Sequence, residues 1–145
     1  MFTISFYIFS SFLSYSDCKK FLVPNTTLIA MAILMLIFGI YESKIDLGSI
    51  VLVLAVLLFF VIILFLKPTM ILGGGDIKYM MVVALYLGVQ PFALFLVVTG
   101  LLQTFVLLYK QKIKRRRVAP MVPVMFVSTI IVDILVIQEI YPFKF

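Results

Sequence analysis

The stretch that decides the fold is Ile71-Leu72-Gly73-Gly74-Gly75-Asp76-Ile77-Lys78. It places one carboxylate directly after three glycines, with long hydrophobic runs on both sides. Glycine lacks a Cβ, so its backbone is free to take φ > 0 and lets another chain come close. An acid at the membrane boundary of such a turn is costly, which makes Asp76 a functional-site candidate. The alternative is an ordinary surface loop, although such a loop does not need three consecutive glycines.

The composition indicates a membrane protein. Of the 145 residues, 65% are hydrophobic and only 12% are charged, and apolar runs of membrane-spanning length recur along the chain. We therefore expect an all-α, polytopic protein of the cell membrane, with residues 1–145 forming a single domain in the lipid bilayer. The first apolar run has no basic n-region and no clear cleavage site, so no separable signal peptide is expected.

The apolar runs predict a bundle of six transmembrane helices, over residues 2–16, 26–41, 48–66, 79–89, 91–109 and 118–138. With six spans, ten of the 12 basic residues lie in loops on one side of the membrane. The positive-inside rule then places Asp17–Asn25, Lys67–Lys78 and Lys110–Arg117 in the cytoplasm and both termini outside. In a soluble protein the net charge of +6 would suggest binding to nucleic acid. Here the positive-inside rule accounts for the positions of the basic residues, so we expect no nucleic-acid partner.

The first and fourth runs are short. They rise about 22 Å and about 16 Å, against a hydrocarbon core of about 30 Å. Asp17 follows the first run and Asp76 precedes the fourth. We therefore predict that both aspartates lie below the cytoplasmic membrane surface, in a protein-lined pocket that water enters.

The absence of some residue types limits the catalytic groups that the protein can use. There is no histidine and one cysteine, Cys18, which excludes Ser-His and Cys-His pairs and imidazole metal sites. We expect no metal and no cofactor, and we interpret Cys18 as a small packing residue. Two close carboxylates share one proton near neutral pH, so one can activate water while the other protonates a carbonyl oxygen. This is the chemistry of aspartic proteases. Asp133, near the outer end of the last run, is interpreted as an interhelical polar contact.

Two other classes of protein remain open on the residues alone. Paired intramembrane aspartates also mark proton pathways, so a small proton-coupled transporter or channel is the alternative to proteolysis. A structural assembly subunit is the third class, and it would tolerate Asp76→Asn.

The motifs resemble those of a known family. Residues 73–78 look like the GxGD motif of the type IV prepilin peptidases, with Gly74 as the variable position. Those enzymes also carry an earlier aspartate followed by a Pro-Asn pair, here Asp17 with Pro24-Asn25. Residues 119–123 resemble the family's Pro-Phe-Gly-Pro stretch at the last helix but lack its central glycine.

The resemblance implies an aspartic endopeptidase that removes the short basic leader of prepilin-like or pseudopilin proteins on the cytoplasmic side. Asp17 and Asp76 would be the catalytic pair, and Gly73, Gly74 and Gly75 would give the substrate backbone access. The supporting residues would be Pro24, Asn25, Lys78 and Pro120, with Lys78 either tuning Asp76 or anchoring the helix at the membrane interface. Nothing resembles the methyltransferase domain of the larger members, so a compact form with peptidase activity alone is expected.

Overall fold

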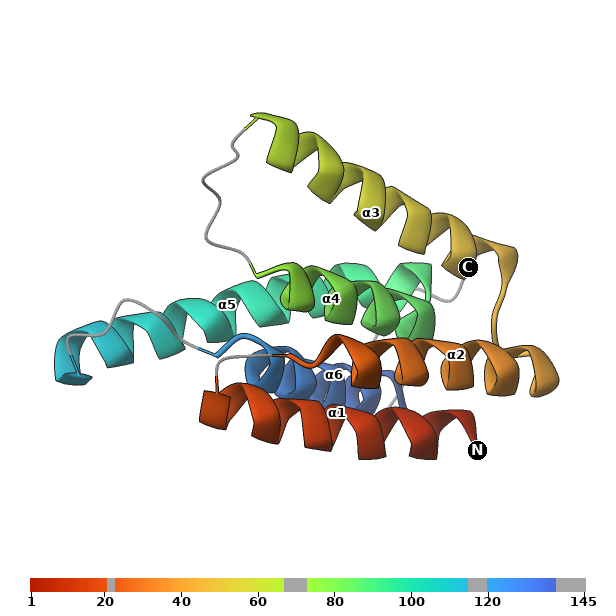
Figure 1. Cartoon of the computed structure of the whole chain (residues 1–145), viewed down its shortest axis with the longest axis horizontal. Helices are drawn as coiled ribbons and strands as arrows, with labels where there is room; N and C mark the ends of the chain where they lie inside the picture. The colour runs from red at the N-terminus through yellow and green to blue at the C-terminus, as the bar shows by residue number, and fades with distance from the viewer. Residues whose placement is uncertain (21–22, 67–72, 115–119, 138–145) are drawn as a thin grey trace.

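The computed structural model describes residues 1–20, 23–66, 73–114 and 120–137, and in these ranges the fold is all-α (Figure 1). The described residues form six helices, as the apolar runs predicted. They are α1 (Phe2–Lys20), α2 (Asn25–Tyr41), α3 (Leu47–Leu66), α4 (Gly74–Leu87), α5 (Val89–Lys114) and α6 (Val122–Ile137).

Helix α4 is the centre of the bundle. It packs against α2, α3, α5 and α6, while α1 packs against α2 and α6. Tyr79, Val83 and Ala84 of α4 are fully buried. The helix ends at Gly88, whose φ of 75° is a backbone conformation that glycine adopts without strain. Pro91 lies in the first turn of α5, where its missing N–H leaves no helical hydrogen bond unmade.

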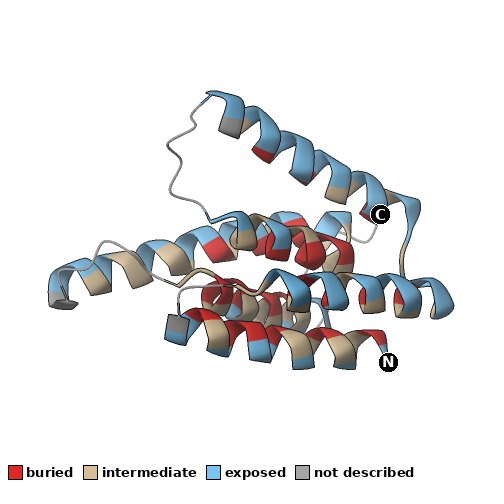
Figure 2. Ribbon diagram, viewed as in Figure 1, coloured by how far each residue is buried: buried red, intermediate tan, exposed pale blue. Residues whose placement is uncertain are grey.

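The outward faces of the helices are apolar. Exposed residues dominate along α3 (Figure 2), and among them are Leu54, Leu58 and Phe65. A soluble monomer rarely exposes so much contiguous apolar surface, whereas lipid covers it without cost. Between Val89 and Lys112, α5 is long and apolar enough to cross a membrane, and α2, the 47–63 part of α3, and α6 are shorter apolar helices.

The predicted ends of the first and fourth helices are wrong. Helix α1 has 19 residues and continues through Asp17 to Lys20, so its rise is about 28 Å and it is not short. Helix α4 begins at Gly74, so Asp76 lies inside its first turn rather than before it. Charged side chains do not stop a helix. Residues 17–20 therefore continue the hydrogen-bonded ladder, and the following helix begins only after Pro24. Helix α4 itself, with 14 residues, remains short.

The end of the bundle that holds the chain's N-terminus contains a half-buried polar cluster. The hydroxyl groups of Tyr7 and Tyr86 both donate hydrogen bonds to Oδ2 of Asp133, the second at 2.9 Å. The Tyr86 ring also stacks on Phe6 with centroids 4.0 Å apart. These contacts join α1, α4 and α6, and they confirm that Asp133 is an interhelical polar contact.

Candidate active site

Asp17 is buried inside the bundle. It is 5% exposed, and its Oδ2 accepts a hydrogen bond of 3.1 Å from the backbone N–H of Val122. Ser10 and Ser14, which lie on the same face of α1, are also buried. Ser10, Ser14 and Asp17 are separated by four and three positions, which places them on one face of the helix. Helix α1 therefore turns a polar stripe toward its neighbours. Burial by packing, rather than a short helix, therefore removes Asp17 from solvent.

The partner of Asp17 comes from the beginning of α6. Val122 is the first residue of that helix, and the first N–H groups of a helix have no partner within it. They point along the axis at the positive end of the helix dipole, which favours a carboxylate there. Pro120 lies just before this turn and is half-buried. The Pro-containing stretch thus positions a backbone donor for Asp17. Ala119, the first residue of that predicted motif, lies outside the described residues.

Asp76 lies in the first turn of α4 and is half-buried. Its carboxylate interacts electrostatically with that of Asp17, which is 59 positions earlier in the chain. The structure therefore brings the two predicted aspartates together at one end of the bundle. We call this the motif end and define it by Asp17, Pro24, Asp76 and Val122. The catalytic role of the pair stays a prediction.

The three glycines have different surroundings. A Cβ on Gly75 would lie 2.8 Å from the Cβ of Val23, and one on Gly73 would lie 3.1 Å from Oδ2 of Asp76. A Cβ on Gly74 would meet nothing within 4 Å. A side chain at position 75 would therefore clash with Val23, one at position 73 would press on the carboxylate of Asp76, and one at position 74 would meet nothing, which agrees with the GxGD motif. The expected freedom to take φ > 0 is not used, because Gly88 is the described glycine with positive φ.

The Pro-Asn pair lies beside the GxGD segment. Asn25 is the first residue of α2, directly after Pro24, and its Oδ1 accepts a hydrogen bond of 2.9 Å from Nζ of Lys78. Both Asn25 and Lys78 are exposed. This contact joins the start of α2 to the start of α4. The ammonium group of Lys78 therefore lies at the edge of the site and not against Asp76. This position suits an anchor at the membrane interface better than a group that tunes Asp76.

Two residues of the site, Val122 and Lys110, were not predicted from the sequence, and the prediction for Cys18 was wrong. The donor of Val122 is a backbone N–H, so its side chain does not mark it. The one available signal was its position at a helix start that follows Pro120. Lys110 of α5 is half-buried and interacts electrostatically with Asp17. It was grouped with the basic loop, but α5 extends to Lys114 and carries it past the site. Cys18 was expected to pack inside, but it is exposed because its position on α1 faces away from the bundle.

The arrangement suits acid–base chemistry between two carboxylates. Two carboxylates that interact electrostatically cannot both carry a charge cheaply, so one retains a proton while the other is ionised. No group of three His, Cys, Asp or Glu side chains that could hold a metal ion occurs among the described residues.

The chain matches the model of the type IV leader peptidase family over residues 4–108, which include both aspartates and all three glycines. No curated protein and no solved structure matches it. The match covers most of the chain and agrees with the motifs and with the apolar helices. The chain therefore belongs to the type IV leader peptidase family, a family of polytopic membrane proteins, and is an aspartic-type peptidase.

Proposed function

We propose that this peptidase removes the basic leader of prepilin-like proteins at the cytoplasmic face of the membrane, with Asp17 and Asp76 as its catalytic pair. The observation that carries the proposal is that these two carboxylates both lie at the motif end and interact electrostatically. Both lie in the segment that matches the leader peptidase family. The peptidase unit is the single domain formed by residues 1–145.

The surroundings of the pair suggest which aspartate is ionised. The Val122 N–H and the Lys110 ammonium both stabilise a negative charge on Asp17. Asp76 has Asp17 itself as a negative neighbour. The single charge of the pair is therefore best placed on Asp17, with the proton on Asp76.

The reaction follows from this placement. Asp17 takes a proton from a water molecule, which attacks the carbonyl carbon of the scissile peptide bond. Asp76 donates its proton to the carbonyl oxygen, and a tetrahedral intermediate forms. When the C–N bond breaks, the leaving amine takes the proton that Asp17 received, and a hydroxyl group of the intermediate returns a proton to Asp76. Gly73 keeps side-chain atoms away from the carboxylate of Asp76, which leaves room there for an extended substrate backbone.

The charge distribution supports a cytoplasmic motif end. Lys19, Lys78, Lys110 and Lys112 belong to helix ends on that side, whereas Lys44 lies in the turn between α2 and α3, at the opposite end. Basic residues flanking membrane helices remain in the cytoplasm. The site then opens on the side where a newly made protein still carries its leader.

The proposal is tested by co-expressing the enzyme with a prepilin-like substrate and following leader removal as a mobility shift. Asp17→Asn and Asp76→Asn each keep the side-chain size but remove the shared proton, so each abolishes cleavage while membrane insertion is unchanged. The double variant is no worse than either single one, because the two carboxylates act as a unit. Full cleavage by the Asp76→Asn enzyme would overturn the assignment.

A further inference from the structure

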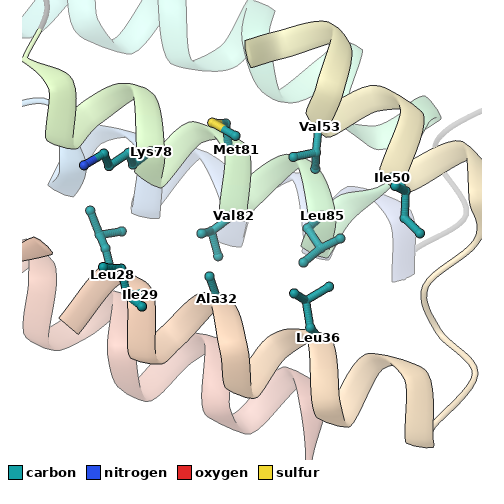
Figure 3. A pocket seen from close by; sticks show the side chains of 10 residues that line it. All are labelled: Leu28, Ile29, Ala32, Leu36, Ile50, Val53, Lys78, Met81, Val82 and Leu85. Carbon is teal, nitrogen blue, oxygen red and sulfur yellow. The ribbon is translucent and has the colours of Figure 1, made fainter. Parts of the chain in front are cut away.

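Helix α4 presents two different faces. Four of its side chains line an apolar groove between α2 and α3, and Figure 3 shows them beside that groove. Another face carries Asp76, Tyr79 and Tyr86, which are three and seven positions apart and so form one row. Tyr79 is fully buried and Tyr86 is half-buried. This row of polar side chains therefore points into the bundle, and none of its members lines the groove.

Helix α1 carries a matching row of polar side chains. Tyr7, Ser10, Ser14 and Asp17 are three, four and three positions apart, which places them on one face of that helix. Tyr7 and Asp17 are ten positions apart, as are the first and last residues of the row on α4, so each row rises about 15 Å. The two rows therefore have the same length.

The two rows meet at both ends and in the middle. The carboxylates of Asp17 and Asp76 interact at the motif end. In the middle, the hydroxyl group of Tyr79 lies near that of Ser10. At the far end, the rings of Tyr7 and Tyr86 are in contact, with centroids 6.3 Å apart. We call the seven side chains of the two rows the polar file: Tyr7, Ser10, Ser14, Asp17, Asp76, Tyr79 and Tyr86.

Three hydroxyl groups of the polar file have no hydrogen-bond partner among the described residues. They belong to Ser10, Ser14 and Tyr79. Ser10 and Tyr79 are fully buried and Ser14 is 8% exposed, so bulk water does not surround them. An unpaired hydroxyl group in a protein interior is costly, and nearly all such groups bind either the protein or an internal water molecule. Thr99 and Gln103 also carry an unpaired buried atom, but they lie on α5 and outside the file.

The two serines do not use the partner that a helix offers them. A serine inside a helix commonly donates a hydrogen bond to the carbonyl oxygen four residues earlier. Four other hydroxyl groups of this chain do so, those of Ser11, Thr104, Ser128 and Thr129. Ser10 and Ser14 make no such bond. Their hydroxyl groups are therefore available to a partner that lies between α1 and α4.

Water has the chemistry of that partner. An internal water molecule makes about three hydrogen bonds to buried polar groups that would otherwise be unpaired. Here three unpaired hydroxyl groups follow one another along the file toward Asp17, so water molecules can bridge each group to the next. The far end is closed, because the hydroxyl groups of Tyr7 and Tyr86 already donate to Asp133. The file therefore leads to the acid pair and not across the membrane.

We propose that the polar file holds a row of water molecules that ends at the acid pair, and that Ser14 positions the water molecule that Asp17 activates. Ser14 is three positions before Asp17 on the same helix face, which brings the two side chains within reach of one shared water molecule. An extended substrate covers the open side of the pair and displaces bulk water there. The file then supplies the reacting water from inside the bundle. This inference rests on the proposed function and adds the source of the water.

Hydrogen exchange of a single thiol tests whether the file is hydrated. In a Cys18→Ser background of the full chain, Ser10→Cys places the one thiol of the protein in the file. Met35→Cys is the control, because Met35 is as fully buried as Ser10 but lies in the apolar core on α2. The S–H stretching band in the infrared spectrum reports conversion to S–D after transfer into D2O. The thiol at position 10 converts several-fold faster than the control, which exchanges only when the protein opens locally. Equal rates would overturn the hydrated file.

The kinetics of leader cleavage test the role of Ser14. Ser14→Ala removes the hydroxyl group, so kcat falls several-fold, while KM is unchanged because Ser14 holds water and not substrate. Ser128→Ala is the matched control: it also removes a buried hydroxyl group from a helix, but that group is already bonded to the carbonyl oxygen of Val124. The control keeps the parent kcat. An equal kcat for the two variants would contradict the role of Ser14, and so would a raised KM with an unchanged kcat.

The two proposals fail in different ways. Leader removal by the Cys18→Ser enzyme reports the proposed function, and the exchange rate of the thiol at position 10 reports the hydrated file. Cleavage together with slow exchange overturns the file and leaves the function standing. Fast exchange without any cleavage supports the hydrated file and contradicts leader removal.

Discussion

Asp17 accepts a hydrogen bond of 3.1 Å from the backbone N–H of Val122, which is 105 positions later in the chain. This contact connects the buried end of α1 with the first turn of α6. Among the standard residues only proline lacks the backbone N–H, so the donor is kept although position 122 carries only an aliphatic side chain. The contact also explains why a proline-containing helix start belongs to the site.

The Val122 contact is tested by Val122→Pro. Proline is favoured at the first position of a helix but has no N–H, so this change removes the donor while α6 can still begin there. A hydrogen bond to a charged group contributes about 1.5–3 kcal/mol, which corresponds to roughly a 10- to 100-fold loss of leader cleavage. Val122→Ala keeps the N–H and serves as the control. Equal cleavage by the two variants would show that Asp17 does not depend on this donor.

Alanine substitutions at the adjacent positions 74 and 75 are predicted to have opposite effects. Gly75→Ala puts a Cβ 2.8 Å from the Cβ of Val23, where neither atom is the flexible end of a side chain. Either α4 or the segment before α2 must shift, and both cleavage and thermal stability in detergent fall. Gly74→Ala meets no atom within 4 Å, so it leaves cleavage unchanged and stabilises the protein by about 0.4–1 kcal/mol, because alanine restricts the unfolded chain.

A compensating change checks the cause of the Gly75→Ala defect. Val23→Gly removes the atom that clashes, so the double variant Val23→Gly/Gly75→Ala regains cleavage. A defect that persists in the double variant would mean that the contact with residue 23 is not what requires glycine at position 75.

The proposed orientation predicts the labelling of two introduced cysteines. In the Cys18→Ser background, Lys112→Cys on α5 reacts with a membrane-impermeant maleimide only after the cells are opened. Ser43→Cys, in the turn between α2 and α3, reacts in intact cells. Both positions are exposed in the structure, so a difference in labelling reports the side of the membrane. The reverse pattern would place the active site outside and contradict cleavage in the cytoplasm.

The Asp133 cluster predicts a stability effect that is separate from catalysis. Tyr86→Phe and Asp133→Asn each weaken the hydrogen bonds that join α1, α4 and α6. Interhelical hydrogen bonds in membrane proteins contribute about 1 kcal/mol, so each change lowers the unfolding temperature modestly. Leader cleavage is largely retained, because the cluster lies at the opposite end of the bundle from Asp17 and Asp76. Loss of cleavage in a stably folded Asp133→Asn enzyme would implicate this acid in the reaction.

The sequence by itself determined the helices and their order. Apolar runs of helical length repeat along the chain, and hydrophobicity is a local property, so six runs were enough to predict six helices. The GxGD and Asp–Pro-Asn motifs also identified Asp17 and Asp76 before any contact was known. The ends of α1 and α4 were predicted less well, because charge lowers the hydrophobicity of a segment without stopping a helix.

The tertiary structure decided what surrounds the two aspartates. Val122 donates through its backbone, which no residue pattern records, and Lys110 reaches Asp17 only because α5 is longer than its apolar run. The need for glycine at position 75 arises from residue 23, far away in sequence. The groove between α2 and α3 likewise depends on how both pack on α4. Such contacts depend on which helix faces meet, and periodicity within one helix does not specify its partner.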